Sequence, residues 1–220
     1  MRNAYMKKLT QLSDLLTQMG ALIEEAIALA IRALEEQNVE FAAKAVAYDP
    51  EIDNKERDIE SLCLQLLLHQ QPVAGDLRLI SAALQMVHDM ERIGDHAADI
   101  AEITIHMAGA PYADKLAHIP QMAEVTAGMV TQAVDAFVKR DLALAGAVIE
   151  RDDEVDALFV RTRADLIDLF RADNANGDQA FDLMMAAKYF EKIGDHAENI
   201  AEWVVFAITG EHKRVSWESE

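Results

Sequence analysis

The sequence predicts an all-α protein made of two tandem, similar antiparallel three-helix bundles, six helices in all. The 220 residues are 51% hydrophobic and include only 9 Gly and 4 Pro, a composition that favours helix. Apolar side chains recur every three or four residues over long stretches, as on amphipathic helices. The segment ERIGDHAADIAE at 91–102 returns as EKIGDHAENIAE at 191–202 with three differences. A repeat of this length indicates an internal duplication.

Breaks in the apolar pattern separate the expected helices. Pro72 interrupts the first half and Gly177 ends the break in the second, while Pro111 lies between the halves. Short breaks between long helices favour antiparallel packing. We therefore expect one three-helix repeat over residues 1–110 and another over 121–212. Their helices are predicted at 5–38, 41–69, 76–107, 121–139, 141–171 and 177–208.

The charge balance limits the possible partners. The chain has 39 acidic and 20 basic residues, a net charge of -19, which repels nucleic acid and anionic membrane surfaces and attracts cations and basic partners. A single cysteine, Cys63, excludes an intrachain disulfide and is expected to be a buried small residue. No signal-peptide h-region or membrane-length apolar run is present. We expect a soluble cytoplasmic protein that meets a membrane only through partners.

Acidic side chains form a stripe on the third helix of each predicted bundle. At about 100° per residue, Glu91, Asp95 and Asp99 share one narrow face. Ile93 and Ile100 point to the opposite face, toward the expected core. On the wheel, His88 and His106 fall in the same sector as the first stripe. The equivalent stripe of the second repeat contains Glu191, Asp195, Asn199 and Glu202.

The second helix of each bundle brings further carboxylates to the same level. Residues level with each other in an antiparallel hairpin have a constant sum of residue numbers. Asp53 with Glu91, and Asp49 with Asp95, both centre on Pro72, the predicted break. Four carboxylates are therefore expected at one level on adjacent helices. The second half repeats the relation with Asp156 and Glu191, and with Asp152 and Asp195.

Facing carboxylates repel one another unless a cation lies between them. Oxygen ligands at this spacing suit a hard cation, so we predict one metal site per bundle, with Mg²⁺, Mn²⁺ or Fe favoured and Zn²⁺ possible where His88 or His106 contributes. The alternative is a solvated acidic face with Arg92, Lys55 and Arg57 as local salt-bridge partners. The candidate metal ligands are Asp49, Asp53, Glu91, Asp95, Asp99, Asp152, Asp156, Glu191, Asp195 and Asn199.

Other residues of the repeated signature have structural interpretations. Gly94 and Gly194 each lower helix propensity by about 1 kcal/mol relative to Ala, so we expect them to permit close helix packing. His96 and His196 lie at the edge of the acidic stripe. Their expected role is helix contact or hydrogen bonding rather than metal ligation.

The two signatures, together with Gln71-Pro-Val-Ala-Gly-Asp-Leu-Arg78, resemble the repeated motifs of the PhoU family of phosphate-signalling regulators. The resemblance covers essentially the whole chain. It implies two similar three-helix bundles, metal binding through Glu/Asp-x-x-x-Asp motifs, and a homodimer. It also implies negative regulation of phosphate uptake and of the phosphate-starvation response, through a phosphate ABC transporter with its ATPase subunit and a sensor histidine kinase. Asp99 departs from the Asn that is commoner in the family, whereas Asn199 keeps it.

An enzyme is not expected, because no nucleophile–base pair or phosphate-cradling glycine loop is evident. The His88-Asp89 pair resembles that of helical metal-dependent phosphohydrolases, but Lys188-Tyr189 stands at its place in the second repeat. A purely structural or metal-storage protein is the other alternative. It would bind metal without any membrane-complex partner.

Overall fold

The computed structural model describes residues 2–70, 74–109, 118–172 and 177–211. These ranges contain helices and no strand, which confirms the predicted all-α class. None of the helices within them is both long and apolar enough to cross a membrane. The predicted breaks and repeat ends at residues 1, 71–73, 110–117, 173–176 and 212 lie outside the described residues. The helices are α1 (Arg2–Glu36), α2 (Val39–Val46), α3 (Asp49–Gln70), α4 (Ala74–His106), α5 (Ile119–Lys139), α6 (Leu142–Ala172) and α7 (Gly177–Thr209).

One helix differs from the prediction. A single helix was expected over 41–69, but the structure divides this segment into α2 and α3. Pro50 accounts for the break, because proline has no N–H to donate and its ring would clash with the carbonyl of Val46 in a continuous helix. The equivalent position in the second half is Asp153, which has no such restriction. There, α6 runs unbroken.

The first turn of each half shows the duplication at the level of the backbone. Gln37 after α1 and Arg140 after α5 both adopt left-handed conformations, with φ of 51° and 53°. Asn38 and Asp141 follow them, and their side chains each accept a backbone N–H from the start of the next helix, at 2.9 and 3.0 Å. These side chains therefore act as N-caps for α2 and α6.

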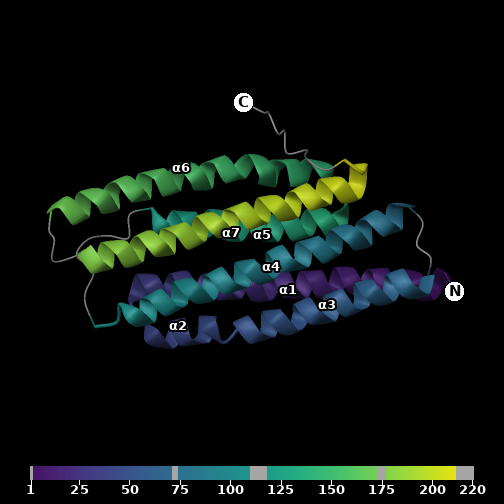
Figure 1. The fold of residues 1–220 in the computed structure, drawn as a ribbon, viewed down its shortest axis with the longest axis horizontal. Helices are drawn as coiled ribbons and strands as arrows, with labels where there is room; N and C mark the ends of the chain where they lie inside the picture. Colours follow the sequence, from purple (N-terminus) through teal and green to yellow (C-terminus); the bar gives the residue numbers. More distant parts are fainter. Residues whose placement is uncertain (1, 71–73, 110–117, 173–176, 212–220) are drawn as a thin grey trace, which may run out of the picture.

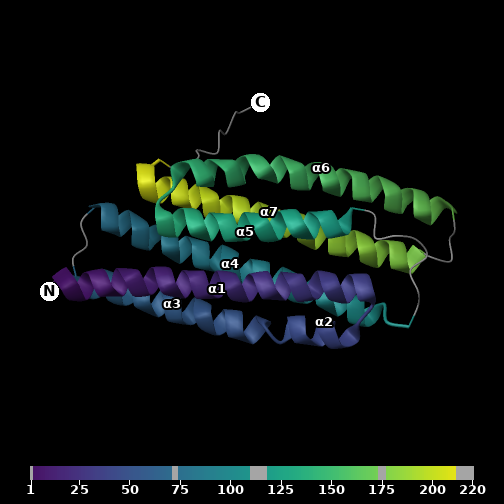
Figure 2. The same ribbon diagram turned by 180° about the vertical axis from the view of Figure 1, so that it is seen from behind.

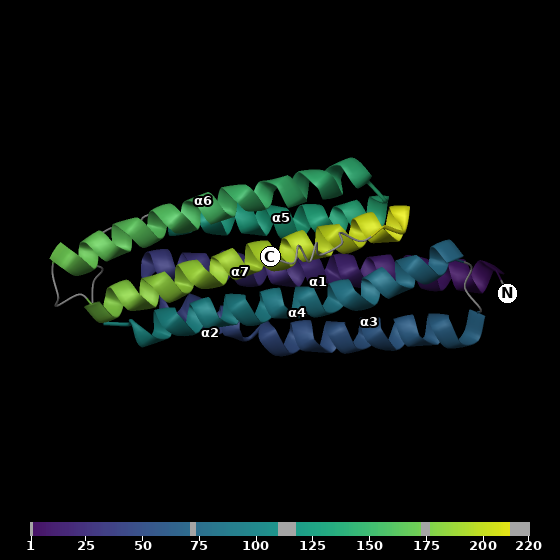
Figure 3. The same ribbon diagram turned by 45° about the horizontal axis from the view of Figure 1, so that its top comes forward.

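The helices form two layers (Figures 1 and 2). In one layer α3, α4, α7 and α6 lie side by side, and α1 and α5 lie together behind them. The most extensive contact in the molecule joins α4 to α7, and α1 also contacts α5. Figure 3 shows α4 and α7 running along each other through the centre of the layer. The two bundles, α1–α4 and α5–α7, are thus packed against each other along their length.

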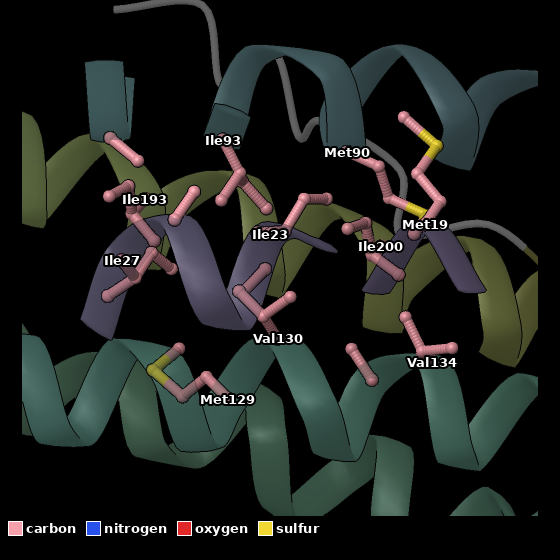
Figure 4. Close-up of a cluster of buried hydrophobic side chains, with 14 of the residues drawn as sticks. Met19, Ile23, Ile27, Met90, Ile93, Met129, Val130, Val134, Ile193 and Ile200 are labelled. Atoms are coloured by element: carbon pink, nitrogen blue, oxygen red, sulfur yellow. The ribbon is translucent and has the colours of Figure 1, made fainter. Parts of the chain in front are cut away.

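A single hydrophobic core joins the two bundles. Its centre is built from all four helices that meet between them (Figure 4). Each fully buried aliphatic side chain contributes about 1.5–3 kcal/mol through the hydrophobic effect. This burial fixes the inner faces of α4 and α7, so their polar stripes must point away from the core. The labelled core residues are Met19, Ile23 and Ile27 of α1, Met90 and Ile93 of α4, Met129, Val130 and Val134 of α5, and Ile193 and Ile200 of α7.

Candidate metal centres

Two glycines allow the helices of each hairpin to approach closely. A Cβ added at Gly94 would lie 2.9 Å from Cδ1 of Ile52 on α3, and one added at Gly194 would lie 2.9 Å from Oδ1 of Asp152 on α6. Both distances are shorter than a packed structure tolerates, which confirms the predicted packing role. At Gly194 the absent side chain makes room for a carboxylate oxygen of the candidate site.

The α3–α4 hairpin brings together Asp49, Asp53, Glu91 and Asp95, as the residue-number sums predicted. Burial and then the charge of Asp95 raise the pKa of Asp49, and Asp53 adds to the effect. Burial, followed by Asp95, also raises the pKa of Glu91, against a lowering effect of Arg92. Crowded, partly buried carboxylates favour their neutral forms. The basic side chains around the first cluster therefore do not fully offset the burial and mutual repulsion of its carboxylates.

The α6–α7 hairpin forms the corresponding cluster from Asp152, Asp156, Glu191 and Asp195. Burial is the largest cause that raises the pKa of Asp152 to about 7, and the charge of Glu198 is the next. Burial and then Glu191 and Asp195 also raise the pKa of Asp156. So high a pKa marks a carboxyl group that is partly buried and surrounded by several negative charges.

Sequence reasoning missed Glu198 as a member of the second cluster. Among neighbouring charges, Glu198 has the largest effect on the pKa of Asp152. The signal was present, because Glu198 lies seven residues after Glu191 and three after Asp195, which places all three on one helix face. The first repeat has Ala98 at this position. A search restricted to features shared by both repeats therefore passes over it.

Basic side chains neutralise part of each cluster. Arg92 lies 2.8 Å from Asp95, and Lys192 forms the equivalent ion pair with Asp195. These pairs agree in part with the alternative of an acidic face with local salt bridges. Arg57 also pairs with Asp53 at 3.1 Å, whereas Lys55 bonds to Gln18 instead. Within the described part of the chain, no ion pair reaches the carboxylates at positions 49 and 152.

The two clusters carry different additional groups. Beside the first, His88 Nδ1 lies 2.7 Å from Glu56 and Nε2 lies 3.5 Å from Glu60. These three side chains place one potential ligand atom each within 4.8 Å of one another. Beside the second, Lys188 donates to both oxygens of Glu191 at 2.6 Å. The imidazole of His88, a potential metal ligand beside the first cluster, is thus replaced by the ammonium group of Lys188 beside the second.

The histidines of the signature make the helix contacts and hydrogen bonds that were expected of them, and the structure places these contacts between the two halves. His196 Nδ1 is 2.8 Å from Oδ1 of Asp89, which connects α7 to α4. His96 stacks on Tyr189 with ring centroids 5.3 Å apart, and the two histidine rings are 5.6 Å apart. Burial is the main cause that lowers the pKa of His96, which favours the neutral ring. These contacts join the bundles.

The outermost predicted ligands are placed differently in the two halves. Asp99 contributes to the raised pKa of Asp49, so it borders the first cluster. Asn199 instead directs its amide to Asp89 across the α4–α7 contact, at 3.4 Å. His106 pairs with Asp182 of α7 at 3.1 Å. The helical wheel grouped His106 with the first stripe, but it lies about 27 Å along α4 from position 88, too far to share one site.

Comparison with known proteins agrees with the two-repeat organisation of the chain. A sequence model of the PhoU domain matches residues 16–104 and 119–204. The phosphate-specific transport system accessory protein PhoU homolog of Clostridium acetobutylicum is 34% identical over 210 residues, covering 95% of this chain and 96% of the relative. The homolog of the same description from Aquifex aeolicus is 37% identical over 186 residues, 84% of each chain.

Solved structures share the fold. The crystal structure of PhoU from Pseudomonas aeruginosa matches with a TM-score of 0.89 and 30% identity, over 94% of this chain and all of that one. The phosphate transport system regulatory protein PhoU from Streptococcus pneumoniae matches with a TM-score of 0.86 at 24% identity, over 96% of this chain, and supports the fold alone. With two domain matches and relatives along nearly its whole length, the chain belongs to the PhoU family.

Proposed function

We propose that this chain is a cytoplasmic, homodimeric negative regulator of phosphate uptake and of the phosphate-starvation two-component response. It acts by binding the ATPase subunit of a phosphate ABC transporter and a sensor histidine kinase. The observation that carries the proposal is the match over 95% of the chain to a phosphate-specific transport system accessory protein. The role is regulatory rather than catalytic.

The acidic surface suggests how the partners are recognised. The chain has a net charge of -19 and two partly exposed carboxylate clusters. Both features favour binding to basic patches on the partner proteins. Complementary charge accelerates encounter and suppresses wrong partners, and salt screens it over about 8–10 Å at physiological ionic strength. Binding to both partners should therefore weaken as salt is raised.

Two measurements test the regulatory proposal. In cells that lack this chain, a phosphate-starvation promoter should be active in high phosphate, and the wild-type chain should silence it. A tagged chain should co-purify the transporter ATPase and the kinase from membranes, with recovery falling between about 50 and about 300 mM NaCl. Normal silencing without the chain contradicts the proposal. Metal binding without any membrane partner would favour the storage alternative.

A divalent or trivalent metal ion at each hairpin is part of the proposal. The chemistry of the donors supports an ion, because each cluster offers several partly buried carboxylate oxygens whose pKa values are raised by burial and then by mutual repulsion. Among the described residues, however, the side chains that place three potential ligand atoms within 4.8 Å of one another are Glu56, Glu60 and His88, so an ion would have to draw the carboxylates of each cluster closer together. In the first hairpin Asp49, Asp53, Glu91 and Asp95 would hold the ion, with Asp99 beside them. In the second, the holding residues would be Asp152, Asp156, Glu191 and Asp195. The ion would supply positive charge and link the two helices of each hairpin.

The metal sites differ in expected preference. Oxygen ligands favour Mg²⁺, Mn²⁺ or Fe, and His88 beside the first cluster admits Zn²⁺. Calorimetric titration with these four metals should show binding that Asp95→Ala removes from the first hairpin and Asp195→Ala from the second. Asp58→Ala, at an exposed position on α3, is the matched control. If neither cluster variant changes the heat of binding, the metal proposal fails.

A further inference from the structure

A small cavity lies where three helix ends meet, at the end of the molecule where α4 begins and α5 and α7 finish (Figure 1). Its volume is about 130 Å³, roughly the space that four water molecules occupy in the liquid. A compact ion fits within such a space. Two arginines, Arg78 and Arg140, line the cavity among apolar residues that include Leu79, Phe137, Val204 and Ile208.

Arg78 has one donor that the described residues leave without a partner. Nε of Arg78 is buried and has no hydrogen-bond partner. Its guanidinium packs over the backbone of Gly210, where an added Cβ would lie 3.4 Å from Nη1. Among the ion pairs that the structure describes, none includes Arg78 or Arg140. Arg78 is half-buried and Arg140 is exposed, so an anion can reach both guanidinium groups from solvent and can accept from the free Nε–H donor.

Helix dipoles do not account for the two arginines. Cations near helix C-termini gain about 0.3–1 kcal/mol, and both α5 and α7 end beside the cavity. However, one carbonyl in the last turn of each helix already has a donor from the backbone: Ala136 accepts from Asp141 at 2.9 Å, and Phe206 accepts from Gly210 at 2.8 Å. The buried Nε reaches no carbonyl.

The internal duplication shows that the fold does not require these cations. At the opposite end, Gln37 occupies the left-handed position equivalent to that of Arg140. The offset of 100 residues between the two signatures makes Asp178 the equivalent of Arg78. One end of the molecule therefore has two arginines where the equivalent positions at the other end hold an amide and a carboxylate. In a chain with a net charge of -19, such a pair of arginines indicates a ligand.

We propose that the Arg78–Arg140 cavity binds a phosphoryl dianion, either inorganic phosphate or the phosphate group of a monoester. Guanidinium groups match phosphate oxygens with paired, charge-assisted hydrogen bonds. A dianion neutralises both arginines, whereas a carboxylate neutralises only one. The positive end of the α4 dipole also lies at the cavity, but the negative ends of α5 and α7 oppose it there, so the two arginines supply the attraction for the anion. The site needs neither a metal nor a protein partner, so it stands independently of the proposed regulatory function.

Calorimetric titration of the full chain, stripped of metal with EDTA, tests the site. Inorganic phosphate, glycerol 3-phosphate and acetate are the probes. We compare Arg78→Gln and Arg140→Gln, the second of which introduces the residue that the equivalent turn already contains. Arg171→Gln is the control, because Arg171 is exposed on α6. Thermal melting without ligand verifies that each variant folds.

The proposal predicts that a phosphoryl dianion binds and raises the melting temperature, with acetate weaker by about tenfold or more. Each cavity variant should lower the affinity by about tenfold or more, while Arg171→Gln leaves it unchanged. Binding of phosphate alone identifies the free ion, and binding of glycerol 3-phosphate alone identifies a phosphorylated molecule. No binding of either probe, or equal affinity in Arg140→Gln and Arg171→Gln, overturns the proposal.

Discussion

Replacing Asp152 by Asn should stabilise the metal-free protein at neutral and higher pH. Burial and the neighbouring charges of Glu198 and Asp195 raise the pKa of Asp152 from 3.8 to about 7. At 1.36 kcal/mol per pKa unit this rise corresponds to about 4 kcal/mol, and partial exposure of the group reduces it to about 2 kcal/mol. Asn has nearly the same shape and no charge. In a chain of this size, about 2 kcal/mol moves the melting temperature by roughly 4–8 °C.

The pH dependence has a defined sign. Between pH 3.8 and about 7 the folded protein keeps a proton on Asp152 that the unfolded chain releases. The free energy of unfolding therefore falls as pH rises through this window and levels off above it. Asp156, whose pKa is raised by burial and by Glu191, adds a slope of the same sign. In Asp152→Asn, the free energy of unfolding should therefore fall less steeply as pH rises.

The assay is urea unfolding at several pH values after EDTA treatment, followed by the same series with Mn²⁺. Asp168→Asn is the matched control, since this α6 carboxylate is 77% exposed and pairs with Arg171. We expect Asp152→Asn to be more stable than wild type without metal and to lose the stabilisation that Mn²⁺ gives the wild type. A variant that is less stable without metal, or that keeps the full pH slope, would refute the reasoning.

Three further predictions follow from local geometry. Gly94→Ala should lower the free energy of unfolding measured in urea, because its Cβ would lie 2.9 Å from Cδ1 of buried Ile52 and overpacking costs about 1–3 kcal/mol. Gly146→Ala, whose Cβ would meet nothing within 4 Å, should instead raise the free energy of unfolding by up to about 1 kcal/mol. Cys63 is fully buried and its pKa is raised to about 12 by burial and Glu60, so a thiol reagent should label it only in urea, and rapid labelling of the native protein would contradict this. Lys188→Met should strengthen Mn²⁺ binding at the second hairpin in calorimetry, since Lys188 donates to both oxygens of Glu191. The control is Lys55→Met, at a lysine bonded to Gln18, which should leave the Mn²⁺ affinity unchanged. An unchanged affinity in Lys188→Met would show that the lysine does not compete with the metal.

Much of the fold and of the candidate site could be predicted because both follow from short-range rules. Helical periodicity placed Ile93 and Ile100 on the buried face of α4, and constant residue-number sums placed Asp53 beside Glu91 and Asp152 beside Asp195. These relations depend only on helix geometry and on turn position. Because the signature occurs twice, the same facing of carboxylates could be predicted in both hairpins.

The remaining features depend on distance along an axis or on a neighbour from another helix. A helical wheel removes the axial coordinate, so it placed His106 with His88 although His106 pairs with Asp182 of α7. The contact between α4 and α7 was not derivable from either hairpin, and therefore the pairing of Asn199 with Asp89 was not visible. Pro50 was a readable signal for the division of α2 from α3.

The duplication separates what the fold requires from what function has added. Features that recur in both halves, such as Gly94 and Gly194 or the left-handed turns at Gln37 and Arg140, have clear structural roles. Charged groups that occur in one half have no such explanation, because the other half folds without them. By this criterion His88, Glu198 and the pair Arg78–Arg140 are the residues to test first. Exchanging each for its counterpart in the other repeat changes the chemistry of a site at a position where the fold already accepts the new residue.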